Sequence, residues 1–129
     1  MGKRIPPKDA TDLLKNWLKG PGNAIKGKGL KDAYETWFSI EELEKYIKYV
    51  KEHIPAEEKP GIRVYYGKYA QGGGPNPTKG LTTVFLAPTK EEEQTNDDGS
   101  TEMVNSNDYS LEAYNDGSTK WPPTNYNSI

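Results

Sequence analysis

The sequence contains no cysteine and a single histidine, His53. The missing thiols exclude disulfide bonds, cysteine nucleophiles and cysteine-ligated zinc sites. One imidazole cannot build a multi-histidine metal centre, so we expect no metal, and because the sequence has no cofactor motif we expect no cofactor. We interpret His53 as a structural residue, because it falls near the C-terminal end of a predicted helix, where partial positive charge is favoured.

Aliphatic side chains are also scarce. Leu, Ile, Val and Phe together account for 21 of the 129 residues, a low fraction for a globular chain. Nine tyrosines and three tryptophans supply part of the missing apolar surface, since each aromatic ring buries a large area. No stretch approaches the roughly 18 apolar residues of a membrane span, and the first residues do not form a signal peptide. We therefore expect a soluble, cytoplasmic protein with a small, aromatic-rich core.

Charge is unevenly distributed along the chain. Residues 1–90 carry 16 basic and 10 acidic side chains, whereas residues 91–129 carry one basic and nine acidic side chains. We interpret the acidic part as a solubilising segment that folds back on the basic body. The alternative is that it shields a basic face from anionic partners.

The best-defined predicted element is a helix that begins after Ser39. Ser39 and Glu42 form a capping box, while Phe38 and Leu43 form a hydrophobic staple. Apolar residues then recur at spacings of three and four until Pro55 ends the helix. They are Leu43, Tyr46, Ile47, Val50 and Ile54.

Other patterns complete the predicted fold. An amphipathic helix over residues 8–19 has an apolar stripe that can pack on the central helix. Residues 20–36 show no sustained period. Alternation predicts strands at 61–70 and 81–89, the second stopped by Pro88, joined as an antiparallel hairpin.

We therefore predict an α+β fold, with two packed helices against a small antiparallel sheet and an irregular C-terminal segment. Residues 1–89 form the compact core. Residues 90–108 form a mobile acidic loop, although alternation over Thr101–Asn105 also favours a third strand there. Residues 109–129 pack back on the core.

Three motifs fall short of a known site. GNAIKGKG at 22–29 has the spacing of a phosphate-binding loop, but Gly29 replaces the Ser or Thr that would hold magnesium. NDDG at 96–99 lacks the first and last acidic ligands of a calcium loop. The loop at 72–80 could offer backbone N–H groups and Lys79 to an anion, although glycine there is also explained by a simple turn.

Basic and aromatic residues are interleaved in the strand at 61–70. Side chains in this arrangement can form a surface that binds a ligand, a partner or single-stranded nucleic acid. The aromatic consensus of RNA-recognition strands is missing, so nucleic acid is disfavoured. The structural alternative is that Tyr66 faces the core while Arg63 and Tyr65 cover the other side of the sheet. The candidate binding residues are Arg63, Tyr65, Lys68, Tyr69 and Lys79.

No catalytic set can be assembled from these residues, so we predict a non-enzymatic module that binds another protein, in the manner of an inhibitor or immunity protein. The alternative is a small-ligand or nucleotide binder that uses the 63–69 strand and the 72–80 loop. A hydrolase of unrecognised type is a third hypothesis. The oligomeric state is left open.

The order WFSIEELEKYIKYV, GIRVYYGKY and TTVFLAPT resembles a group of small bacterial proteins of unknown function. The later NDG, Trp-Pro-Pro and Tyr126 are similar as well. The resemblance implies a shared fold and carries no activity with it. It draws attention to Arg63, Tyr65, Gly67 and Tyr69, whose residue types recur in that group.

Overall fold

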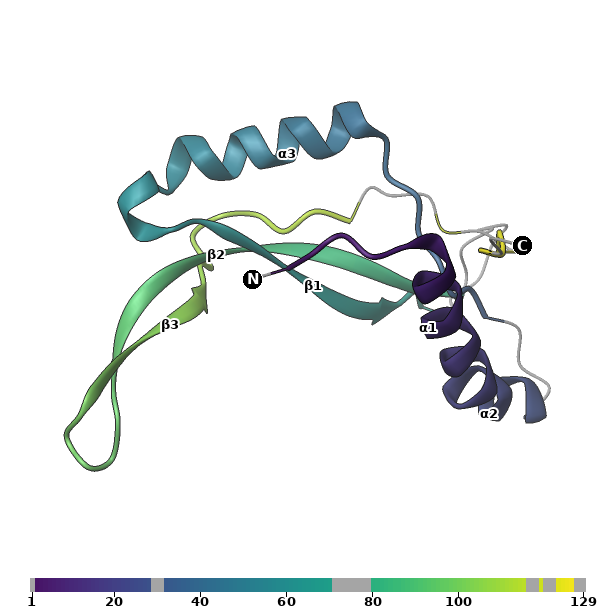
Figure 1. The fold of residues 1–129 in the computed structure, drawn as a ribbon. Helices are drawn as coiled ribbons and strands as arrows, with labels where there is room; N and C mark the ends of the chain where they lie inside the picture. The colour runs from purple at the N-terminus through teal and green to yellow at the C-terminus, as the bar shows by residue number, and fades with distance from the viewer. Residues whose placement is uncertain (1, 29–31, 71–79, 116–118, 120–122, 127–129) are drawn as a thin grey trace.

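The computed structural model describes residues 2–28, 32–70, 80–115, 119 and 123–126. They form helices and a three-stranded antiparallel sheet, which confirms the predicted α+β class (Figure 1). In chain order the elements are α1 (Pro7–Lys19), α2 (Pro21–Gly27), α3 (Ile40–His53), the 3-10 turn η1 (Ala56–Glu58), β1 (Gly61–Lys68), β2 (Thr82–Thr95) and β3 (Thr101–Asn107).

The long strand β2 is the centre of the sheet, with β1 along its first half and β3 along its second half. The register runs from Lys68 opposite Thr82 to Gly61 opposite Thr89 in the first ladder. In the second ladder it runs from Thr89 opposite Asn107 to Thr95 opposite Thr101. The two neighbours of β2 therefore overlap only at Thr89.

The C-terminal segment completes the edge of β2 that β3 leaves open. Leu86 and Tyr114 exchange both backbone hydrogen bonds, at 2.8 and 2.9 Å. The Asn115 side-chain amide donates to the Val84 carbonyl oxygen at 2.8 Å. These bonds satisfy backbone groups that would otherwise face solvent beside the core.

The core lies between α3 and the sheet. As predicted, the Ser39 hydroxyl accepts a hydrogen bond from the Glu42 N–H, at 3.0 Å, and caps the helix. The predicted apolar stripe then packs on β2 and on the C-terminal segment, where Tyr114 stacks on Tyr46 with ring centroids 5.2 Å apart. The buried cluster consists of Tyr46, Val50, Ile54 and Leu86.

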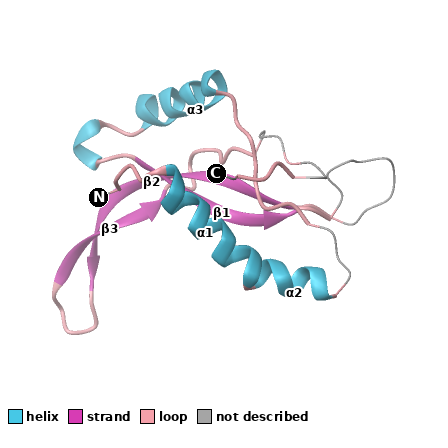
Figure 2. Cartoon of the chain, turned by 45° about the vertical axis from the view of Figure 1, so that its right-hand side comes forward, coloured by secondary structure: helices cyan, strands magenta, loops and turns pink. Residues whose placement is uncertain are grey.

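The two apolar stripes do not pack on each other, contrary to the expectation that the first helix would cover α3. Figures 1 and 2 show α1 near the end of β1 and the start of β2, away from α3. Trp17 of α1 contacts Tyr34, with ring centroids 6.3 Å apart. The stripe of α3 is instead covered by Leu86, Leu111 and Tyr114.

Residues 21–27 form the short helix α2, where the sequence showed no sustained period. Gly20 and Pro21 end α1, but proline at the first position also favours a new helix. A side chain at Gly22 would lie 2.9 Å from the Trp17 ring, so glycine permits this close approach. The phosphate-loop spacing beginning at Gly22 therefore falls on helix rather than on a loop after a strand.

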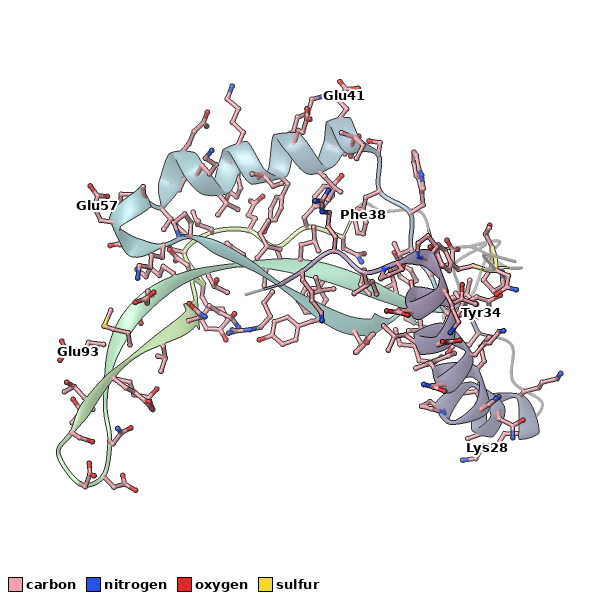
Figure 3. The ribbon with its side chains drawn as sticks, viewed as in Figure 1. Lys28, Tyr34, Phe38, Glu41, Glu57 and Glu93 are labelled. Atoms are coloured by element: carbon pink, nitrogen blue, oxygen red, sulfur yellow. The ribbon has the colours of Figure 1, made fainter. Side chains whose placement is uncertain are left out.

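Most of residues 90–108 form a β-hairpin, so the prediction of a loop is wrong for this segment. The NDDG motif is its turn: Gly99 has φ of 85° and donates its N–H to the Asn96 carbonyl oxygen at 3.0 Å. The third strand expected at Thr101–Asn105 is confirmed and extends to Asn107. Figure 3 shows this acidic hairpin, which carries Glu93, projecting beyond the helices.

Pro88 lies inside β2 rather than at its end. Its carbonyl oxygen points to the β3 side and accepts from the Asp108 N–H at 2.9 Å, just past the last residue of β3. The N–H that proline lacks would point to the same side, where the regular ladder has stopped. At the end of this ladder Pro88 therefore forgoes only the reciprocal hydrogen bond to Asp108, and the strand continues through it.

Candidate functional site

Arg63 and Tyr65 lie on the face of the sheet opposite α3, where they meet the end of β3. The Arg63 guanidinium donates from Nη1 to Asn107 Oδ1 at 2.6 Å and from Nη2 to the Asn105 carbonyl oxygen at 2.8 Å. The Tyr65 ring stacks on Phe85, with centroids 5.2 Å apart. Two of the predicted residues are therefore brought together and held by strands β2 and β3.

Asn107 is the centre of this cluster, and sequence reasoning missed it. Its Nδ2 donates to the hydroxyl oxygen of Tyr65 at 2.7 Å and to that of Tyr109 at 3.3 Å. Sequence reasoning also missed Tyr109, a large aromatic residue that is 89% exposed in the structure. Neither residue has a local signal of function, because the contact between Arg63 and Asn107 depends on the register of three strands and Tyr109 joins the cluster only through Asn107.

A cavity of about 310 Å³ opens beside this cluster. Tyr65, Phe85, Ala87 and Leu111 supply most of its apolar wall, and Asn107 and Tyr109 lie at its polar side. The described residues that line it are Tyr65, Phe85, Ala87, Pro88, Asn107, Asp108, Tyr109, Leu111 and Ala113. Its volume is at the small end of ligand sites, which span roughly 300–1,000 Å³.

The cluster also changes the acidity of Tyr65. The hydrogen bond from Asn107, followed by one from Arg63, lowers the pKa of the Tyr65 phenol below its usual value. Both donors stabilise the phenolate more than the phenol. The positive guanidinium adds to the same effect.

The other predicted residues do not join this cluster. Lys68 lies on the opposite face and contacts Gly80 and Asp32 through its ammonium group, at 2.6 and 3.6 Å. The Tyr69 hydroxyl donates to Asn115 Oδ1 at 3.2 Å. Lys79 and residues 72–79 of the glycine-rich loop lie outside the described residues, so the predicted loop contribution stays a prediction.

A second surface is formed by the α3-facing side of β1. Ile62, Val64 and Tyr66 share this face and are 37%, 58% and 84% exposed. The interpretation that Tyr66 faces the core is therefore wrong, because α3 packs over β2 and leaves most of the Tyr66 side chain uncovered. We refer to Ile62, Val64 and Tyr66 as the β1 apolar row.

Comparison of the chain with protein-family models, curated proteins and solved structures finds no match. The resemblance to small bacterial proteins therefore stays a prediction. Within the described part of the chain, no group of three or more His, Asp or Glu side chains is placed to hold a metal ion. None of the described helices has the length and apolar character required to cross a membrane.

Proposed function

We propose that this chain is a non-enzymatic, cytoplasmic binding protein that takes an extended segment of a partner protein along the outer edge of β1. The supporting observation is that β1 is an edge strand of the sheet and presents its apolar row half-exposed. Addition of a strand to an open sheet edge is a recurrent mode of peptide recognition.

The backbone of β1 offers the hydrogen-bonding groups that such a segment needs. The Tyr69 N–H donates to the Leu81 carbonyl oxygen at 3.0 Å. Bonded pairs alternate in an antiparallel ladder, so Arg63, Tyr65 and Gly67 also point toward β2. The N–H and C=O groups of the β1 apolar row therefore point outward, and no described strand lies along them.

The side chains beside this edge favour a particular kind of segment. Ile47, Pro60 and Ile62 help to line a groove of about 350 Å³ between α3 and β1. Lys51 lines the same groove, and no described carboxylate forms an ion pair with it. We infer that the partner segment has apolar residues at alternate positions and an acidic residue near Lys51.

The experiment compares peptide capture by the wild type and two variants at Val64. Random linear peptides are selected on the wild-type protein and then tested on Val64→Pro and Val64→Thr. Val64→Pro removes an outward N–H but leaves the ladder bonds of Arg63 and Tyr65 in place, so we expect it to abolish capture. Val64→Thr keeps the N–H and the branched shape, so we expect it only to weaken capture.

Two outcomes would overturn the proposal. The first is equal capture of the selected peptides by the wild type and Val64→Pro, with circular dichroism showing that both are folded. The second is a wild-type dimer in analytical ultracentrifugation that Val64→Pro dissociates, because the edge would then be occupied by a second copy of the chain. Hydrogen exchange gives an independent reading, since a bound strand must protect the amides of Ile62, Val64 and Tyr66.

A further inference from the structure

The cluster around Asn107 presents two phenol hydrogens whose acceptors the described chain does not supply. The Asn107 amide donates to both the Tyr65 and the Tyr109 oxygen, so each phenol is an acceptor in that bond. A phenol has one O–H of its own to donate. Within the described residues, neither the Tyr65 nor the Tyr109 hydroxyl donates a hydrogen bond.

The orientation of Asn107 is fixed by Arg63. The Arg63 Nη1 donates to Asn107 Oδ1 at 2.6 Å, which turns the amide nitrogen toward the two phenols. No described carboxylate lies within ion-pair distance of the Arg63 guanidinium. The cluster therefore combines two hydroxyl donors with an uncompensated positive charge.

Asp108, the one carboxylate among the described residues that line the neighbouring cavity, already has hydrogen-bond and ion-pair partners. Asp108 Oδ1 accepts from the Ser110 N–H at 3.0 Å and from the Ser110 hydroxyl at 2.5 Å. Its other oxygen lies 3.9 Å from the Lys90 ammonium group. These contacts stabilise the Asp108 carboxylate and lower the pKa of its carboxyl.

We propose that this cavity binds a small aromatic carboxylate. Its ring would lie against Phe85, Ala87 and Leu111, which provide an apolar wall. Its carboxylate would accept the free hydrogens of Tyr65 and Tyr109 and lie within the field of Arg63. The site is on the face opposite the β1 apolar row and does not depend on strand addition.

The test titrates the full chain with benzoate, phenylacetate and indole-3-acetate, followed by NMR of the backbone amides. Benzyl alcohol and benzamide serve as uncharged probes of similar shape. We expect at least one carboxylate to bind in the millimolar range or tighter, with shifts centred on Phe85, Asn107 and Leu111. The uncharged probes should bind more weakly.

Two phenylalanine variants locate the contact. Tyr109→Phe removes one exposed hydroxyl and should weaken carboxylate binding about tenfold, the loss expected for a hydrogen bond to a charged group. Tyr126→Phe makes the same chemical change at a tyrosine that is 47% exposed and does not line the cavity, so binding should be unchanged. The proposal fails if none of the three carboxylates shifts these amides, if the uncharged probes bind equally well, or if the two variants have the same effect.

Discussion

Asp32 joins the segment before α3 to the end of the sheet, and its replacement provides a direct test of that connection. Asp32 Oδ1 accepts from the N–H groups of Ala33 and Thr82, at 2.8 and 2.5 Å. Its Oδ2 accepts from the Thr82 hydroxyl at 2.6 Å and lies 3.6 Å from the Lys68 ammonium group. Only 8% of the Asp32 side chain is exposed.

Asp32→Ala removes the acceptor of three hydrogen bonds and leaves the Thr82 N–H without its partner. A buried polar group without a partner costs about 1–3 kcal/mol, and bonds to a charged group are at the upper end of the usual range. The Lys68 side chain is 55% exposed, so its ion pair adds little. We expect a loss of about 3 kcal/mol in the free energy of unfolding, or about 10 °C in Tm.

Urea denaturation and calorimetry of the wild type, Asp32→Ala and Asp98→Ala measure this loss. Asp98 is a matched control, because it accepts from both the N–H and the hydroxyl of Ser100 in the exposed hairpin turn. Its replacement should leave Tm almost unchanged. If Asp32→Ala unfolds like the wild type, or if both variants lose the same stability, the assignment of Asp32 as a buried connection is wrong.

The same residue predicts a response to acid. Burial acts to raise the pKa of the Asp32 carboxyl, but the hydrogen bonds from Thr82 and Ala33 together lower it below the ordinary value of 3.8. Its contribution to stability is therefore complete above about pH 3.8 and is lost as the pH falls through the lower folded value. The difference in stability between the wild type and Asp32→Asn should shrink below that pH. A difference that stays constant would contradict the assignment.

Three further predictions concern the core and the Asn107 cluster. Tyr46→Phe should cost about 1 kcal/mol in urea denaturation, because the Tyr46 hydroxyl donates to the Glu112 carbonyl oxygen at 2.9 Å; no loss would contradict this bond. Ile54→Ala should cost about 2–5 kcal/mol, since Ile54 is 1% exposed, whereas Ile40→Ala at a 71% exposed position should change stability by less than about 0.5 kcal/mol. In Asn107→Ala the pKa of Tyr65, followed by NMR of labelled tyrosine, should rise relative to the wild type. An unchanged value would mean that the Asn107 hydrogen bond does not lower the Tyr65 pKa.

Signals that act between near neighbours in the sequence predicted the centre of the fold correctly. The Ser39 N-cap places the start of α3 directly after Ser39, and Pro55 places its end near His53, whereas the Glu42 carboxylate of the predicted capping box accepts from Tyr114 instead. Alternation likewise located β1 and the first half of β2. In each case the deciding interactions lie within a few residues, so the sequence pattern carries them.

Features that depend on distant contacts were not predictable in this way. Alternation shows that Val64 and Tyr66 share a face, but it does not show whether a helix covers that face. The polar composition of residues 90–108 describes an exposed hairpin as well as a loop, because the difference lies in cross-strand pairing. The meeting of Arg63 with Asn107 joins residues 44 positions apart, and no local pattern records it.

The bridge between Leu86 and Tyr114 affects when the core can fold while the chain is being synthesised. Tyr114 packs on Phe38 and Tyr46, and its hydroxyl donates to Glu42, 72 positions earlier in the chain. A nascent chain that has not yet emerged to Tyr114 therefore exposes the aromatic side of α3. Because such long-range contacts form late and slow folding, the core should close only after the C-terminal segment leaves the ribosome, and the helix needs protection from aggregation until then.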